Sequence, residues 1–190
     1  MSDRERIIDL LNAAADRHGV DRRYVHAIAR IESGHRHFDN RGNVLRSSAG
    51  ALGVMQLMPT TARGLDVNPL NLEDNIEGGV RYFRQRLDLS GGDVPTAIAM
   101  YYAGIGNVRD RGALQWEGVQ RYIRNFQALV NNEDILTMAG QDRLAPAPAI
   151  PAAPIAPIPA PEVAQGAGSG AWLLAAFVVV IVIILILGGS

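Results

Sequence analysis

A run of prolines limits the architecture of this chain more than any other feature. Residues 144–161 read LAPAPAIPAAPIAPIPAP. Because proline has a fixed φ angle and no amide donor, this run excludes a regular helix or a central strand. It predicts an extended, semi-rigid spacer, with recruitment of a proline-binding partner as the alternative. Residues 163–170, VAQGAGSG, add a flexible joint, so we expect a linker over residues 144–170.

The chain after this linker is uncharged and strongly apolar. Residues 171–187 read AWLLAAFVVVIVIILIL, close to the lower length limit for a helix that crosses a bilayer. A buried helix of a soluble domain is the alternative. However, this run is rich in β-branched residues and follows a linker, so we expect no globular core for it to enter. We therefore predict a C-terminal transmembrane helix with Trp172 at the membrane interface. The charged N-terminal segment lacks the pattern of a secretory signal.

Residues 1–140 instead have the pattern of one folded, mainly helical domain. Apolar residues recur there at helical spacing, and strand signals are weak throughout. Residues 35–50 predict a loop or a short hairpin. Beyond two helices in the first 34 residues, the periodicity predicts helices near residues 72–89, 94–103 and 116–131.

Local signals mark where several of these helices begin and end. Ser2 and Glu5 have the spacing of a capping box. Asp21 fits the N-cap of the second helix, and Gly34 fits its left-handed C-cap. Asp93 precedes a proline at the start of a later helix, as helix N-termini commonly do.

Composition excludes several classes of function. The net charge is −1 with acids and bases interspersed, which argues against a nucleic-acid partner. The absence of cysteine removes disulfides, thiolate zinc sites and cysteine nucleophiles. His35, His37 and Asp39 are candidate metal ligands, but without a further suitable histidine they favour a solvated loop. We expect no metal and no cofactor.

Glu32 is the first candidate for chemistry. It lies one helical turn beyond Ile28 and so continues an apolar stripe near the C-terminal end of its helix. Apolar surroundings and the negative end of the helix dipole both raise a carboxyl pKa. A glycosidase needs such a proton-holding acid. The alternative is an ion pair with Arg30 or Arg36, or a position at the edge of the stripe.

Four ordered blocks decide between these alternatives. They read IESG at 31–34, SSAGALGVMQLMPTTA at 47–62, NPLNLEDNIEGGVRYF at 68–83 and AMYYAGIGNV at 99–108. In this order they resemble the soluble-lytic-transglycosylase-like family of peptidoglycan-cleaving enzymes. The resemblance covers roughly residues 5–125 and implies a lysozyme-like, mainly α (α+β) fold.

The resemblance also implies roles for individual residues. Glu32 matches the catalytic acid/base, and Tyr101 matches a tyrosine close to the carboxyl, where it could hydrogen-bond Glu32. Two features depart from the family pattern: Tyr102 stands where asparagine is common, and the loop before Ser47 is longer. The matches to substrate-binding positions are Ser47, Met55, Gln56 and Tyr101, and the matches to supporting positions are Asn75, Ile76 and Gly79. Loop capping is the alternative role for Ser47.

The resemblance implies cleavage by a single acid. Glu32 would cleave the β-1,4 bond between N-acetylmuramic acid and N-acetylglucosamine, and a 1,6-anhydro end would form. Asp39, Asp66 and Asp74 are available as a second carboxylate, but none matches such a role. A muramidase that uses water is the second hypothesis. The third is a catalytically silent glycan-binding or virion protein, for which Tyr102 is a hint.

A cell-wall substrate and a C-terminal membrane anchor together suggest where the protein acts. The expected partners are peptidoglycan glycan strands, a lipid bilayer, and other proteins of a virion or a secretion machine. A membrane-containing bacteriophage would carry such an enzyme in its internal membrane and use it during genome delivery. The alternative is a bacterial inner-membrane enzyme that faces the periplasm. Few charges flank the anchor, so the positive-inside rule does not decide its orientation.

Overall fold

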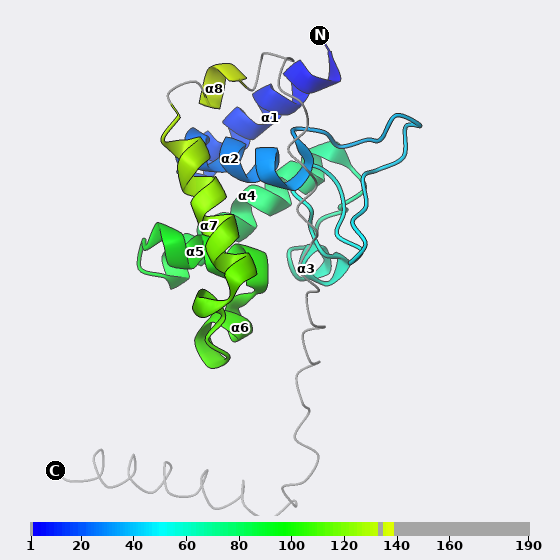
Figure 1. The fold of residues 1–190 in the computed structure, drawn as a ribbon. Coiled ribbons are helices and arrows are strands. Elements are labelled where there is room, and N and C mark those ends of the chain that lie inside the picture. Colours follow the sequence, from blue (N-terminus) through cyan, green and yellow to red (C-terminus); the bar gives the residue numbers. More distant parts are fainter. Residues whose placement is uncertain (1, 133–134, 139–190) are drawn as a thin grey trace, which may run out of the picture. The chain divides into compact units, whose positions relative to one another are not determined.

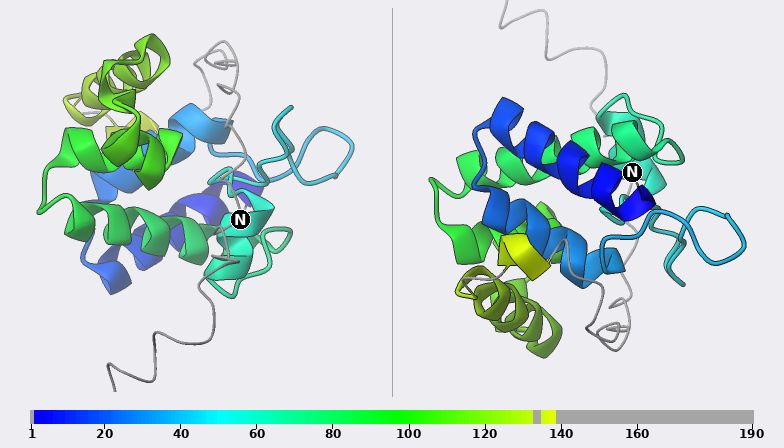
Figure 2. Two further views of the ribbon diagram at one scale, coloured as in Figure 1. Left: turned by 90° about the horizontal axis from the view of Figure 1, so that it is seen from below. Right: turned by 90° about the horizontal axis from the view of Figure 1, so that it is seen from above.

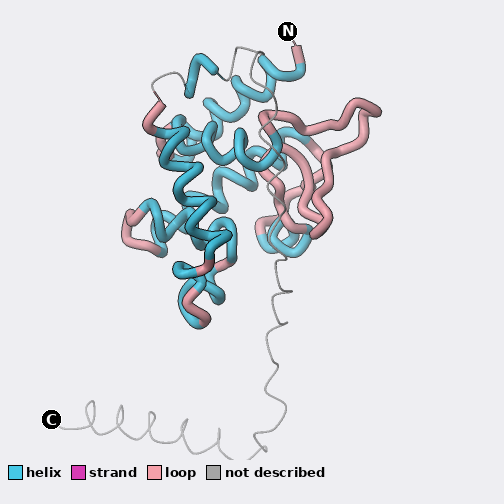
Figure 3. Tube along the Cα trace, viewed as in Figure 1, coloured by secondary structure: helices cyan, strands magenta, loops and turns pink. Residues whose placement is uncertain are grey.

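The computed structural model describes residues 2–132 and 135–138, and the chain there is mainly helical (Figures 1 and 3). The predicted linker at 144–170 and the predicted transmembrane helix at 171–187 lie outside these residues. Within the described part, no helix has the length and hydropathy needed to cross a membrane. The elements are α1 (Asp3–His18), α2 (Arg22–Ser33), α3 (Pro59–Gly64), α4 (Leu72–Leu89), α5 (Val94–Ala103), α6 (Ile105–Asp110), the 3-10 helix η1 (Ala113–Gln115), α7 (Glu117–Val130) and α8 (Ile135–Met138).

The predicted helix ends are confirmed. Ser2 and Glu5 form a reciprocal capping box at the start of α1. The side chain of Asp21 accepts a hydrogen bond from the amide of Arg23 at the start of α2, and Gly34 ends that helix with a φ of +64°. Asp93 caps α5 in the same way. Short polar side chains and a left-handed glycine were sufficient signals here.

Helix boundaries agree with the periodicity where helices are long, and the short elements were missed. The predictions near 72–89, 94–103 and 116–131 correspond to α4, α5 and α7. Two six-residue helices, α3 and α6, the three-residue η1 and the four-residue α8 were not predicted. Elements this short do not repeat an apolar position often enough to produce a helical period.

Between α2 and α3 the chain forms an irregular segment, residues 35–57, which lies to one side of the helices in Figure 1. Three isolated antiparallel bridges hold it: Phe38 with Val44, Arg46 with Leu52, and Leu52 with Leu57. The expectation of a loop or short hairpin is confirmed, and these bridges are the β component of the described residues.

The first bridge closes a small hairpin, residues 38–44, and Asp39 closes its turn. The Asp39 carboxylate accepts hydrogen bonds from the amides of Arg41 (2.8 Å) and Asn43 (2.9 Å). Gly42 has a φ of +79°. Arg41, Gly42 and Asn43 are all exposed. The Asp39 side chain therefore stabilises this hairpin from within.

The hydrophobic core lies among the five longer helices, α1, α2, α4, α5 and α7. α4 packs against α1 and α5, and α7 packs against α2 and α5, an arrangement visible from two sides in Figure 2. Ion pairs Arg6–Glu73 and Arg17–Glu77 join the outer surfaces of α1 and α4. The largest fully buried core side chains include Leu11, Val25, Ile28, Ile76, Phe83, Ile98 and Phe126. This packing brings the C-terminal half of α2 alongside α7.

Candidate functional site

Glu32 lies in the last turn of α2, facing α7, with a partly buried side chain. The hydroxyl of Tyr122 on α7 donates to Glu32 Oε1 at 2.6 Å. Burial raises the pKa of Glu32 to about 7, and the Tyr122 bond lowers it in part because it favours the anion. A carboxyl with this pKa can donate and accept a proton near neutral pH.

The alternative of an ion pair for Glu32 is not found. Among the described residues neither Arg30 nor Arg36 forms a salt bridge with this carboxyl. The Nε of Arg36 instead donates to the main-chain oxygen of Ser33 at 3.3 Å. In residues 2–132 and 135–138, therefore, no ion pair holds Glu32 in its charged form.

Tyr122 was missed by sequence reasoning. It lies on the buried face of α7 with Val119, Ile123 and Phe126, where an apolar stripe predicts packing and nothing more. One signal was available: a buried tyrosine normally finds a hydrogen-bond partner for its hydroxyl. No rule of spacing along the chain identifies that partner as Glu32, because the two residues are 90 positions apart.

Tyr101 lies beside the carboxyl, but its expected hydrogen bond to Glu32 is wrong. Its hydroxyl donates to the main-chain oxygen of Met55 at 2.8 Å. Burial raises the Tyr101 pKa well above its usual value, and the nearby charge of Glu32 adds to this. The ring of Tyr82 meets that of Tyr101 edge to face at 5.4 Å, and Arg86 lies 3.9 Å above the Tyr82 ring. Tyr101 thus ties α5 to residues 51–57.

Tyr102, the departure from the family pattern, packs on Tyr122. The two ring centroids are 4.6 Å apart and the rings are nearly parallel, at 29°. The hydroxyl of Tyr102 is buried and has no hydrogen-bond partner in the part of the chain that the structure describes. Tyr102 therefore touches the residue that bonds the carboxyl, and its contribution there comes from its ring.

Met55 and Asn75 connect the irregular segment to α4. Asn75 is fully buried; its Oδ1 accepts from the Met55 amide at 2.9 Å, and its Nδ2 donates to the oxygens of Leu52 (2.8 Å) and Pro69 (3.0 Å). The Met55 side chain is also fully buried. It packs on Gly79, where an added Cβ would lie 2.5 Å from Met55 Cβ. The buried Met55 side chain therefore supports the irregular segment by packing against α4.

Ser47 and Gln56 are both partly buried and both serve the loop. Ser47 Oγ accepts from the amide of Ala51 at 3.0 Å, which is the loop-capping role considered as its alternative. Gln56 has a φ of +47°, which is uncommon for a residue with a side chain, and its Nε2 donates to the Gly53 oxygen at 2.7 Å. The Ser47 hydroxyl proton and the Gln56 Oε1 have no partner among the described residues.

The prediction that His35 and His37 lie in a solvated loop is wrong, because both side chains are buried. His26 Nε2 lies 3.0 Å from Asn12 Oδ1, so this nitrogen carries a proton, and Nδ1 accepts from His35 Nε2 at 3.1 Å. His37 Nδ1 accepts from Val54 N, and its Nε2 donates to Leu70 O.

These histidines are neutral structural groups. Burial lowers the pKa of His26 to about 4 and that of His35 to about 3. Asp39 does not join them, because it closes its own hairpin. Within the described residues no group of three or more histidine, cysteine or acidic side chains is arranged to hold a metal ion.

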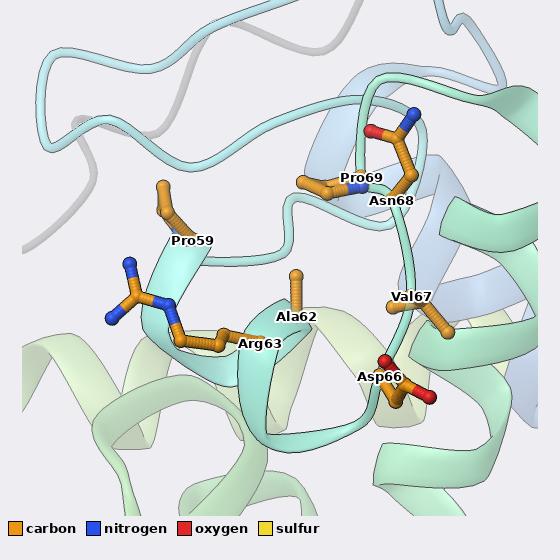
Figure 4. Close-up of a pocket in the computed structure, with 7 residues that line it drawn as sticks. All are labelled: Pro59, Ala62, Arg63, Asp66, Val67, Asn68 and Pro69. Carbon is orange, nitrogen blue, oxygen red and sulfur yellow. The ribbon is translucent and has the colours of Figure 1, made fainter.

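A separate hollow of about 480 Å³ lies beside α3 (Figure 4). Figure 4 shows Arg63 and Ala62 on the short helix and Asp66 on the turn that follows it. The full lining is Pro59, Ala62, Arg63, Asp66, Val67, Asn68 and Pro69. None of the predicted catalytic or substrate-binding residues belongs to it.

The sequence model of one family, described as the transglycosylase SLT domain, matches residues 9–121. This range is more than half of the 190 residues. The chain belongs to the transglycosylase SLT domain family. The resemblance of the four blocks is thereby confirmed, and with it the mainly helical fold class. The matched range contains Glu32, the irregular segment and Tyr101, and it ends one residue before Tyr122.

Named relatives share this domain. A protein called Transglycosylase from Enterobacteria phage PRD1 is 32% identical over 168 residues, which cover 85% of this chain and 60% of the relative. A membrane-bound lytic murein transglycosylase F from Desulfosudis oleivorans is 38% identical over 112 residues, covering 53% of this chain and 22% of the relative. The chain therefore spans 60% or less of the length of these relatives.

Solved structures share the fold. The 70 kDa soluble lytic transglycosylase of Escherichia coli matches with a TM-score of 0.56 and 24% identity, over 70% of this chain and 24% of that one. An inactive mutant of the lytic transglycosylase Slt from Pseudomonas aeruginosa matches with a TM-score of 0.55 at the same identity and coverage. Both matches are to a part of a much longer chain, as expected for an SLT domain.

Proposed function

We propose that this protein is a peptidoglycan lytic transglycosylase that uses Glu32 as its single acid/base. The observation that carries the proposal is the Glu32 carboxyl itself, which lies between two helices with a pKa raised to about 7 and no cation paired to it. Such a group holds a proton at neutral pH and can take it back in a later step. Membership of the SLT domain family supports the same reaction class.

The reaction follows from one residue acting twice. Glu32 first donates its proton to the oxygen that links N-acetylmuramic acid to N-acetylglucosamine, and that bond breaks. The substrate's acetamido group stabilises the positive charge that develops at the anomeric carbon. The Glu32 carboxylate then takes the proton of the muramic 6-hydroxyl, whose oxygen bonds to that carbon. A 1,6-anhydro end forms, and Glu32 is again protonated.

Two of the three candidate second carboxylates, Asp39 and Asp74, are occupied by hydrogen bonds within the protein, which supports this mechanism. Asp39 accepts from two amides of its own hairpin. Asp74 Oδ2 accepts from the amide of Asn68 at 2.9 Å. Asp66 lies on the hollow beside α3, which contains no other predicted site residue. A hydrolase that activates water needs a free carboxylate about 5–9.5 Å from the acid.

We assign the substrate contacts to the irregular segment, residues 35–57. Ser47, with its hydroxyl proton, and Gln56, with its Oε1, offer one free group each for the acetamido and hydroxyl groups of a sugar. Met55 and Tyr101 support the irregular segment through the hydrogen bond from the Tyr101 hydroxyl to the Met55 main-chain oxygen. No metal or organic cofactor is needed for these steps.

The setting proposed is local opening of the cell wall during genome delivery by a bacteriophage. The relative in phage PRD1 supports this setting, and the apolar run at 171–187 supports anchoring to a virion membrane. The bacterial inner membrane facing the periplasm is the alternative location, for which the relatives named membrane-bound lytic murein transglycosylase F speak.

Product analysis tests the activity. The full chain is incubated with purified peptidoglycan, and the released muropeptides are weighed by mass spectrometry. Muropeptides with 1,6-anhydro ends are expected, 18 Da lighter than hydrolysed ones because one water is not added. Ordinary reducing ends would instead identify a muramidase. A lack of any released product would favour the silent glycan-binding protein.

A further inference from the structure

Tyr102, Tyr122 and Glu32 make successive contacts across three helices. The ring of Tyr102 on α5 stacks on that of Tyr122 on α7 with 4.6 Å between centroids. Tyr122 in turn donates its hydroxyl to Glu32 Oε1 on α2 at 2.6 Å. Only the Tyr122 ring therefore separates Tyr102 from the reacting carboxyl.

The contribution of Tyr102 comes from its ring and not from its hydroxyl. That hydroxyl is buried without a partner, which is unfavourable for stability. The hydroxyl lies against Gly118, one turn before Tyr122 on α7, where an added Cβ would be at an ordinary contact distance of 3.4 Å. Asparagine, the residue common at this position in the family, has no ring with which to stack.

We propose that Tyr102 is a positioning residue, whose stacked ring fixes the Tyr122 ring and thereby the direction of the Glu32 carboxyl. This inference rests on the proposed function. A tyrosine ring turns about two side-chain bonds, and stacking on one face removes most of that freedom. The Tyr122 hydroxyl is then already in place when Glu32 gives up its proton and must be stabilised as an anion.

Two substitutions at this position separate the ring from the hydroxyl. Tyr102→Leu keeps much of the volume and removes the stack, so kcat should fall about tenfold with little change in KM. Tyr102→Phe keeps the stack and removes only the unpartnered hydroxyl, so kcat should stay within about twofold. Both are measured on soluble glycan strands with the full chain.

The pH profile gives a readout that general loosening of the fold does not move. The Tyr122 bond favours the Glu32 anion, so a weaker bond raises the pKa of this carboxyl. In Tyr102→Leu the limb on which kcat/KM falls with rising pH should therefore move to higher pH. Tyr122→Phe should move it in the same direction and further.

Tyr24 supplies the matched control. It also joins α2 to α7, through its ring contact with Phe126 at 5.6 Å, but it lies two turns before Glu32. Tyr24→Leu should lower the melting temperature and leave the pH limb in place. In the Tyr122→Phe background, adding Tyr102→Leu should lower kcat less than about twofold, because the route through the Tyr122 hydroxyl is already removed.

Several results would overturn the inference. These are an unmoved pH limb in Tyr102→Leu, an equal shift in Tyr24→Leu, a tenfold loss in Tyr102→Phe, or full additivity in the double variant. If Tyr102→Leu does not fold, Tyr102→Asn replaces it, with the same fall in kcat expected. Titration of the ¹³C-labelled Glu32 carboxyl by NMR detects the same pKa change without turnover. Failure of the proposed function can therefore be distinguished from failure of the proposed role of Tyr102.

Discussion

The ionisable side chains on and just after α2 are of two kinds, the carboxyl of Glu32 and the imidazole rings of His26 and His35, and burial shifts their pKa values in opposite directions. Desolvation disfavours charge in both. The pKa of Glu32 rises to about 7, so the carboxyl keeps its proton, whereas the pKa values of His26 and His35 fall to about 4 and 3, so the rings lose theirs. One group can transfer a proton, and the other makes fixed neutral hydrogen bonds.

The partners of the two groups differ accordingly. Glu32 has one hydrogen bond, from Tyr122, and a side chain that is partly exposed to an incoming substrate. His26 bonds His35 and Asn12, and the neighbouring His37 bonds the main chain. The comparison teaches that a perturbed pKa indicates a reactive group only where solvent or substrate can also reach it.

The largest effect should come from removing the proton-holding group. Glu32→Gln should lower release of muropeptides by at least about a thousandfold, since general acid/base catalysis contributes about 10²–10⁴-fold and this residue acts twice. Mass spectrometry of the products measures this, with circular dichroism to show that the variant folds. Wall cleavage that survives the change would contradict the assignment of the acid.

The same variant should be more stable at alkaline pH. The folded pKa of Glu32, about 7, lies above its ordinary value of 4.5. Between these values the folded state binds more protons than the unfolded state, so this residue makes stability fall as pH rises. Glu32→Gln should therefore melt at a higher temperature than the unaltered protein at pH 8, and the difference should shrink towards pH 4.

Asn75 tests the neutral hydrogen bonds that hold the irregular segment. Asn75→Ala removes three hydrogen bonds from a fully buried side chain, which should cost about 3 kcal/mol of unfolding free energy at about 1 kcal/mol for each bond. Urea denaturation measures this. Asn68→Ala is the control, because its exposed side chain bonds only the amide of Leu70; an equal loss there would argue against the role of Asn75.

The histidines should destabilise the fold in acid. Their folded pKa values lie below the ordinary value of 6.5, so the unfolded state takes up protons first as pH falls below 6.5. Stability is then lost down to about pH 4, amounting to about 2 kcal/mol for each histidine by pH 5. Urea denaturation at pH 7 and pH 5 should show it, and His26→Leu should have a shallower pH dependence. A flat profile in the unaltered protein would contradict neutral, buried rings.

The smallest expected effect comes from a variant that alters the surroundings of Glu32 and leaves the histidines unchanged. Tyr122→Phe removes the hydrogen bond that Glu32 receives among the described residues and opens no cavity, so the Glu32 pKa should rise and the alkaline limb of kcat/KM should move up by less than about one pH unit. Its acid unfolding should match that of the unaltered protein, because the histidines are untouched. A downward shift would mean that water, not Tyr122, stabilises the anion.

Sequence reasoning reached what is encoded locally or in ordered motifs. The caps at Ser2, Asp21 and Gly34 act over a few residues, and the long helices repeat their apolar positions often enough to be read. Glu32 could be found because its block has a distinctive order relative to the others. What failed depends on packing: a histidine in a polar loop carries no sign of burial, and Tyr122 has the same pattern as its apolar neighbours.

The hairpin at residues 38–44 has a practical consequence. Asp39 closes the turn with hydrogen bonds inside the hairpin, and Arg41 and Gly42 at its tip are exposed. The tip is therefore a suitable site for attaching a label. A dye or a short epitope attached at Arg41 would leave the acid and its tyrosines in place. Single molecules could then be followed by microscopy as they travel over a bacterial wall.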